Sequence, residues 1–200
     1  RSVKDTKLIF NTYNNVNYHT KSLDIKNLSF GKLKEPFTSN LDPAVEEAYE
    51  KICEQLEIQG AKIEEVVIPE ASEKGVLFPK IVGSEIISAF GIDRFINNVD
   101  KMDPVTGNRA KLGLDVSSHE YIRAKERVLQ LEKLANKYFQ KYDALLSPTT
   151  VMLPLDVNKA EIGKELHKRS LLASANTQPV NIFGICGITY PIQKFVKNNV

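Results

Sequence analysis

The side chains best suited to nucleophilic chemistry in this 200-residue sequence are two cysteines and three histidines. Cys186 with His119 or His167 would be the thiol–imidazole pair that can attack a carbonyl carbon. Cys186, however, lies in the apolar run Ile-Phe-Gly-Ile-Cys-Gly-Ile, and apolar surroundings disfavour the thiolate. His119 falls in the first turn of an expected helix, where the helix dipole disfavours an imidazolium. We therefore expect Cys186 to be an inert core residue and His119 to lie at the surface.

The same residue types predict no metal site and no cofactor. Cys53 and Cys186 show neither a metal-ligand spacing nor a disulfide framework. The histidines lack the carboxylate–histidine spacing of catalytic metal sites. Unpaired thiols are typical of a cytoplasmic protein, which is the location that we expect.

Charge and hydropathy exclude other function classes. The formal net charge is +2 and basic and acidic residues alternate, so we expect no direct contact with nucleic acid. The longest apolar stretches, such as residues 182–188, are far shorter than a membrane span. Hydrophobic residues make up 42% of the chain, which is enough for a globular core.

The elements that would position polar groups follow a strand–helix–strand order. Residues 28–33 and 62–68 have the short apolar patterns of strands. Between them, Asp42 and Pro43 begin an amphipathic helix that ends near Gly60. A strand, a helix and a second strand within about forty residues form a βαβ unit, which favours parallel strands and an α/β fold.

Further elements are expected on both sides of this unit. The predicted segments are a short helix capped by Ser2 and Asp5, a helix at 76–91, a long helix from Ser117 to about Tyr142, a strand at 143–147, a helix at 161–176 and a last strand at 185–192. Residues 92–116 contain Asp103–Pro104, Gly107 and Gly113, so we expect a long loop that is either disordered or a functional lid.

Four segments resemble the amidase signature family. They are Tyr142-Asp-Ala-Leu-Leu-Ser-Pro-Thr-Thr150, similar to YDxLLxPTxP; Thr177-Gln-Pro-Val-Asn181-Ile-Phe-Gly184, similar to TxPxNxxGxP; Arg1-Ser-Val-Lys-Asp5, similar to RSVxDxAxLL; and the order of strand, Asp42–Pro43 helix, Gly60–Ala61 turn, strand and Pro69. The resemblance covers essentially the whole chain in the right order. Cys186, Gly187 and Val151 depart from the family pattern, and these departures bear on substrate identity.

The resemblance implies a mixed, twisted β-sheet flanked by helices, with the chain forming a single partial domain over residues 1–200. It also implies a serine nucleophile activated through a second serine and a lysine, with the serines in a Gly-Gly-Ser-Ser segment. That segment precedes the stretch that resembles Arg1–Asp5, and no Gly-Gly-Ser-Ser occurs in this sequence. We therefore expect no catalytic residue here, and the first residue, Arg1, favours a truncated chain whose partner is the missing N-terminal half.

Five residues are candidates for binding a small amide substrate. Open sheets bind ligands at the carboxyl ends of their strands, and the candidates flank expected strand ends: Thr149, Thr150, Met152, Thr177 and Asn181. Their hydroxyl and amide groups could orient an amide by hydrogen bonding. The alternative is that the threonines satisfy turn backbone and that Asn181 bridges backbone groups. Ile86 and Phe90 could line an apolar pocket, but their helical spacing favours packing in the core.

Three function hypotheses stay open. The first is the substrate-pocket half of an amidase that cleaves carboxylic amides, inactive in isolation. The second is the glutaminase subunit of a tRNA-dependent amidotransferase, which would need partner subunits. The third is an α/β binding module without chemistry. A sheet without its neighbours exposes edges and apolar faces, so we also expect homo-oligomers or low solubility.

Overall fold

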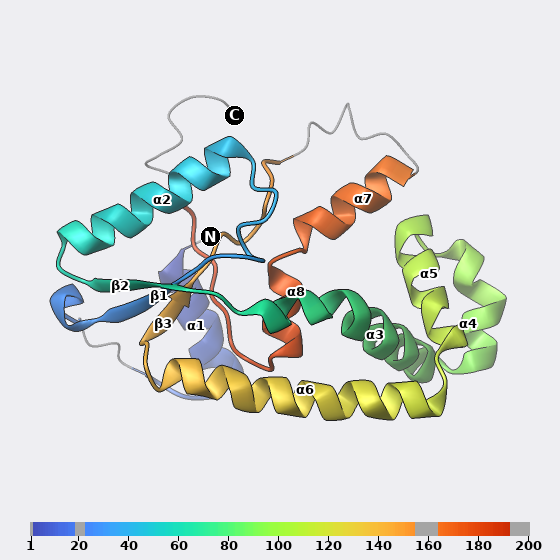
Figure 1. Cartoon of the computed structure of the whole chain (residues 1–200). Coiled ribbons are helices and arrows are strands. Elements are labelled where there is room, and N and C mark those ends of the chain that lie inside the picture. The colour runs from blue at the N-terminus through green and yellow to red at the C-terminus, as the bar shows by residue number, and fades with distance from the viewer. Residues whose placement is uncertain (1, 19–22, 155–163, 193–200) are drawn as a thin grey trace.

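The computed structural model describes residues 2–18, 23–154 and 164–192, and it has an α/β fold built on a small parallel sheet (Figure 1). The sheet has the strand order β2-β1-β3, where β1 is Ser29–Leu33, β2 is Lys62–Val66 and β3 is Ala144–Leu146. Phe30 on the central strand lies opposite Ile63 on one side and Ala144 on the other, and both pairings are parallel. The predicted strands at 28–33, 62–68 and 143–147 are confirmed.

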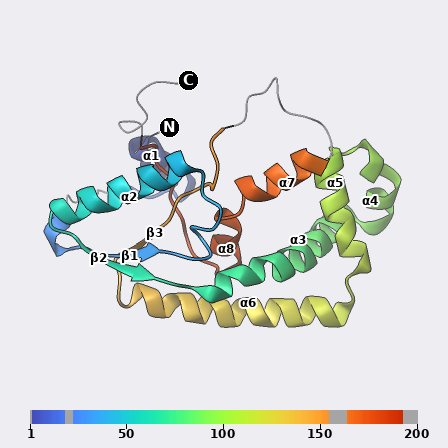
Figure 2. The ribbon, with the colours of Figure 1, turned by 45° about the horizontal axis from the view of Figure 1, so that its top comes forward.

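Helix α2 (Pro43–Ile58) connects β1 to β2 and covers one face of the sheet (Figure 2). Asp42 caps it, with its side chain accepting a hydrogen bond from the Ala44 N–H at 2.9 Å. The buried hydroxyl of Tyr49 lies 3.0 Å from the Leu33 carbonyl and 2.8 Å from the Leu146 carbonyl. Because these carbonyls belong to neighbouring strands, α2 stabilises the pairing of β1 with β3.

The main hydrophobic core lies on the opposite face, under α6 (Ser118–Phe139), α3 (Lys74–Phe90) and α8 (Thr177–Ile182). Leu131 of α6 is fully buried, and it belongs to the same cluster as Leu33 and Val66 of the sheet. The predicted capping box of α6 is present, since Ser117 and Glu120 bond each other's backbone N–H groups. Two short 3-10 turns flank the strands in the sequence: η1 (Ile25–Asn27) precedes β1, and η2 (Pro69–Glu73) follows β2.

Residues 92–116 are helical, and the expectation of a long loop there is wrong. They form α4 (Ile92–Asn98), η3 (Val99–Lys101), α5 (Pro104–Lys111) and η4 (Leu112–Asp115). Asp103 and Pro104 interrupt one helix but begin another, because the Asp103 carboxylate caps α5 by accepting from the Thr106 N–H at 3.0 Å. Phe95 anchors a second small core here at 1% exposure. A lid role for this segment stays a prediction.

The predicted last strand at 185–192 is also wrong. These residues have no regular secondary structure, and Cys186 is exposed, contrary to our expectation of a core thiol. A strand requires a neighbouring strand to satisfy its backbone groups, and none of the strands described pairs with this segment. The helix expected at 161–176 is found as α7 (Lys164–Ala173), and its predicted start lies outside the described residues.

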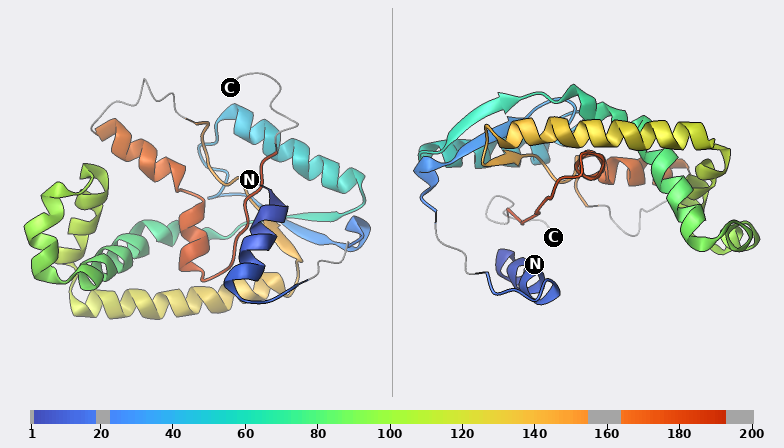
Figure 3. Two further views of the ribbon diagram at one scale, coloured as in Figure 1. Left: turned by 180° about the vertical axis from the view of Figure 1, so that it is seen from behind. Right: turned by 90° about the horizontal axis from the view of Figure 1, so that it is seen from below.

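Helix α1 (Val3–Tyr13) has the predicted Ser2–Asp5 capping box but buries none of its residues. Figure 3 shows it set apart from the sheet and from the other helices. Its large apolar side chains are exposed, Leu8 at 67% and Ile9 at 68%. In the described ranges, no single helix is long and apolar enough to cross a membrane, although one bent pair, Pro69–Phe90 with Ile92–Lys101, is so by length and composition.

Candidate functional site

Three of the five candidate residues meet at one cavity. Thr149 follows β3, while Thr177 and Asn181 belong to α8, and all three line a cavity of about 440 Å³. The apolar part of its lining comes from the carboxyl end of β1, the end of α6 and residues 183–188, and includes Leu33, Phe37, Tyr138, Phe139 and Ile185. Hydroxyl and amide groups therefore sit beside apolar surface at the strand ends, which is an arrangement that can orient a small polar substrate.

The hydrogen bonds of the candidates separate them into two groups. The Thr149 hydroxyl is exposed and lies 3.3 Å from the hydroxyl of Thr189, which also lines the cavity. The Thr150 hydroxyl donates to the Met152 carbonyl at 2.9 Å, and neither Thr150 nor Met152 lines the cavity. Thr150 therefore fits the alternative interpretation, in which a threonine hydroxyl satisfies the backbone of a turn. Thr177 has both features, because its hydroxyl donates to the Ser174 carbonyl at 3.2 Å while the residue lines the cavity.

Asn176, which the sequence analysis missed, connects the segments that carry these threonines. Its side chain is buried, and its amide nitrogen donates to the Phe37 and Pro148 carbonyls, at 2.8 Å each. Phe37 follows β1 and Pro148 follows β3, so one amide links the carboxyl ends of two neighbouring strands to the start of α8. Only its position next to Thr177 in the sequence could have drawn attention to it.

A second cavity, of about 460 Å³, lies among α3, α5, α7 and α8, the helices whose arrangement Figure 2 shows. Its lining is mostly apolar and includes Phe78, Pro79, Val82, Ile86, Leu112 and Leu171. Two cations also line it, Lys74 from the first turn of α3 and Arg109 from α5. Burial lowers the pKa of Lys74, whose ammonium group donates to the Ala175 carbonyl.

The two apolar residues of α3 singled out from the sequence, Ile86 and Phe90, lie in different surroundings. Ile86 lines the second cavity and also packs against the small core around Phe95, so it does both things that its spacing allowed. Phe90 is 45% exposed and stacks against the Arg94 guanidinium, 5.7 Å from its ring centroid, so its expected place in the core is wrong.

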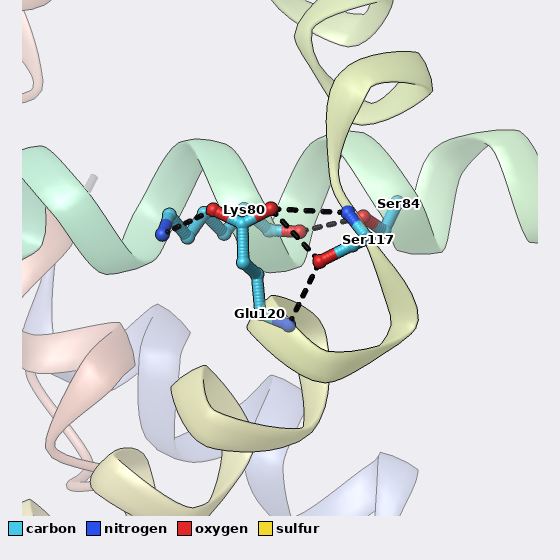
Figure 4. Close-up of polar contacts among 4 residues, drawn as sticks. All are labelled: Lys80, Ser84, Ser117 and Glu120. Carbon is cyan, nitrogen blue, oxygen red and sulfur yellow. Dashed lines mark hydrogen bonds and ion pairs between the residues drawn. The ribbon is translucent and has the colours of Figure 1, made fainter.

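A lysine and two serines come together between α3 and α6, but their contacts are structural (Figure 4). The Lys80 ammonium group donates to the Glu120 carboxylate at 2.9 Å, and the Ser84 hydroxyl donates to the Lys80 carbonyl at 2.7 Å. The Ser117 hydroxyl donates to the same carboxylate at 3.0 Å as part of the helix cap. These groups hold the start of α6 against α3, and neither serine bonds the lysine amine.

The remaining nucleophiles and metal ligands offer no catalytic arrangement among the residues with defined positions. Cys53 is buried, and burial raises the pKa of its thiol to about 11. His119 is exposed, as predicted. His19 and the side chain of His167 lie outside the described residues. No group of three His, Cys, Asp or Glu side chains in the part of the chain searched could hold a metal ion.

Comparison with known protein families shows which family the chain belongs to. The family model described as Amidase matches residues 4–199. The chain belongs to the amidase family. This agrees with the four motifs, and the helices around a small sheet are part of the amidase fold. A crystal structure described as an amidase superposes on 92% of this amidase chain with a TM-score of 0.75 and 19% sequence identity.

Curated relatives of this amidase chain have more than one activity. The 2-amino-5-chloromuconic acid deaminase of Comamonas testosteroni is 28% identical over an alignment of length 172 that covers 84% of this chain and 37% of that protein. One subunit of the glutamyl-tRNA(Gln) amidotransferase of Streptococcus suis (strain 05ZYH33) is 30% identical over an alignment of length 217 that covers 94% of this chain and 43% of that protein. The chain thus spans about two fifths of the length of these relatives.

Proposed function

We propose that this chain supplies the substrate-binding part of an enzyme that hydrolyses small carboxylic amides. The attacking serine, the second serine and the lysine would come from a segment that precedes it. The observation that supports this function most directly is the convergence of Thr149, Thr177 and Asn181 on one cavity beyond the carboxyl ends of β1 and β3. Membership of the amidase family supplies the reaction type.

The polar groups of this cavity suit an amide group. A threonine hydroxyl can donate to the amide oxygen or accept from the amide N–H, and the Asn181 side chain can do both. The Asn176 bonds to Phe37 and Pro148 hold the two threonine-bearing segments at a constant separation. Such groups orient the substrate carbonyl toward an attacking atom and do not themselves attack it.

The first experiment compares the 22.5 kDa chain with a longer protein that includes the preceding segment. Both are incubated with a fluorophosphonate probe and assayed with simple amides. We expect the longer protein to be labelled on one serine and to release ammonia or amine, and the isolated chain to show neither. Stoichiometric labelling of a single serine in the isolated chain would contradict the proposal.

The second experiment tests the binding residues in that longer protein. Thr149→Val and Thr177→Val each remove a hydroxyl from the cavity, and a neutral hydrogen bond contributes about 0.5–1.5 kcal/mol. We therefore expect kcat/KM to fall about threefold to tenfold for each variant. Thr150→Val is the matched control, because this hydroxyl bonds a turn carbonyl outside the cavity. An equal loss for Thr150→Val would show that the effect is on folding.

A second candidate function is the glutaminase subunit of a tRNA-dependent amidotransferase, which the 30% identity to the Streptococcus suis protein over 94% of this chain favours. It would require partner subunits and glutamine as the amide. Purification of the longer protein with a second subunit, together with glutamine turnover, would support it. If the longer protein neither reacts with the probe nor hydrolyses any amide, the α/β binding module is the remaining hypothesis.

A further inference from the structure

We propose that the second cavity, among α3, α5, α7 and α8, binds the carboxylate end of an apolar acid, with Lys74 and Arg109 as its cationic partners. The cavity measures about 460 Å³, within the range of about 300–1,000 Å³ that is typical of small-molecule sites. Its apolar side chains provide surface for a hydrocarbon chain or a ring. The two cations provide charge that a purely apolar ligand would leave uncompensated.

The cations of this cavity differ from others nearby in their partners. Lys80, Lys125 and Arg127 each pair with a carboxylate of this chain. For Lys74 and Arg109 the described residues provide no ion pair, and the Lys74 ammonium group bonds only a neutral carbonyl, that of Ala175. A partly buried ammonium group beside apolar surface is costly unless an anion compensates it. A ligand carboxylate would be that anion, and its negative charge would oppose the lowering of the Lys74 pKa by burial.

The lining also indicates which ligands are disfavoured. No aspartate or glutamate is among the residues described around this cavity, whose other polar side chains are Thr106 and Gln178. A ligand with an ammonium group beside its carboxylate would find no anionic partner there and would meet two positive charges. The cavity is therefore suited to a simple carboxylate and not to an amino acid such as glutamine.

This inference names a substrate class that rests on the proposed function. If the enzyme hydrolyses amides, the suitable substrate is an apolar acid that carries an amide group elsewhere, such as the monoamide of a dicarboxylic acid. The charged end would lie between α3 and α5, and the reacting amide would extend toward the serine supplied by the preceding segment.

The test measures binding to the 200-residue chain, by calorimetry or NMR titration, and requires no turnover. The probes are hexanoate, neutral hexanamide and norleucine, which share a chain length and differ only in charged groups. We expect hexanoate to bind at least about tenfold more tightly than either of the others, because a hydrogen bond to a charged group contributes about 1.5–3 kcal/mol. Equal binding of hexanamide or norleucine, or no binding of any probe, would overturn the proposal.

Variants locate the site. Lys74→Met and Arg109→Met remove the charge and keep the apolar stem, so each is expected to weaken hexanoate binding about tenfold or more. Lys133→Met is the matched control, since Lys133 is exposed on α6 and does not line the cavity. Thermal unfolding of each variant shows whether it is folded. An equal loss of binding in Lys133→Met would refute the assignment. Hexanoate binding without amide hydrolysis by the longer protein would leave this site intact and reject the proposed function.

Discussion

At the scale of single residues, polar groups that the sequence motifs do not emphasise organise the candidate site. Asn176 is the main example, because one side-chain amide satisfies two backbone carbonyls that come from distant parts of the chain. Buried carbonyls without a donor carry a large free-energy cost. The stability of the region around Thr149 and Thr177 should therefore depend on Asn176.

We expect Asn176→Ala to lower the free energy of unfolding by about 2–4 kcal/mol, since it leaves the Phe37 and Pro148 carbonyls buried without their donor. Urea denaturation monitored by circular dichroism measures this change. Asn181→Ala is the control on the same helix, and its side chain is exposed, so a change within about 0.5 kcal/mol is expected. Similar values for both variants would show that the two Asn176 bonds contribute little.

Glu120 should make stability depend on pH in the acid range. The Lys80 ammonium group and the Ser117 cap hold the pKa of its carboxyl at about 2, below the ordinary value of 4.5. The folded state thus binds this proton more weakly than the unfolded state does. Its stabilising contribution is complete above about pH 4.5 and is lost as the pH falls toward 2.

The melting temperature measured from about pH 6 to about pH 2.5 tests this dependence. We expect Glu120→Gln to flatten the acid side of the profile and to lower the melting temperature at the upper end of this range. Glu126→Gln, on the exposed face of the same helix, is the control, because the ion pair described for Glu126 is a long one with Arg123, at 3.9 Å. If the two profiles coincide, Glu120 does not contribute to the acid transition.

At the scale of elements, a glycine contact explains how residues 92–116 pack. Gly113 in η4 lies against Gly83 in α3, so closely that a Cβ on Gly113 would be 2.2 Å from the Gly83 carbonyl carbon and 2.5 Å from the Ser84 nitrogen. Both neighbours are backbone atoms, which cannot rotate away. The approach of η4 to α3 therefore requires glycine, and it fixes one boundary of the second cavity through Leu112.

Gly113→Ala should separate η4 from α3 and destabilise the fold by about 1–3 kcal/mol or more. Chemical denaturation checks this value. Gly75→Ala, near the start of α3, is the control with the opposite expected sign. A Cβ there meets nothing within 4 Å, so better helix propensity should stabilise by up to about 1 kcal/mol. If Gly113→Ala leaves the free energy of unfolding unchanged, η4 is not held against α3.

At the scale of the whole molecule, the feature that stands out is apolar surface without a partner. Helix α1 buries no residue, and Leu8, Ile9 and Phe10 are all more than half exposed. Contiguous exposed apolar surface of this kind is typical of an interface. The chain also spans only 37–43% of the length of the relatives described above, so surface that is covered in a longer protein would be open here.

We therefore expect the 200-residue chain to self-associate, which light scattering with size-exclusion chromatography detects. The double variant Leu8→Lys with Ile9→Lys should shift the mass toward that of a monomer, because it replaces apolar surface by charge without loss of buried contacts. Ile58→Lys is the control, since Ile58 is 78% exposed but lies on α2. A monomeric parent chain would contradict the expectation.

Local sequence determined the elements whose signals lie within a few residues. The Ser117–Glu120 and Ser2–Asp5 capping boxes, the Asp42–Pro43 helix start and the βαβ order were all predicted, because caps and apolar periodicity depend on neighbouring residues. The four motifs identified the family for the same reason. The sequence placed Thr149, Thr177 and Asn181 beside expected strand ends. Thr149 does follow β3, whereas Thr177 and Asn181 lie on α8, and all three share a cavity.

Tertiary structure decided what depends on contacts between distant segments. Asp103–Pro104 signals an interruption in the sequence, but whether a loop or a new helix follows depends on whether Phe95 and Ala110 find a core to pack against. Residues 185–192 alternate like a strand, yet a strand forms only beside a partner, and the strands described supply none. The bonds of Asn176 and the cavity that Lys74 and Arg109 both line bring together residues 28 or more positions apart, and no local pattern encodes such contacts.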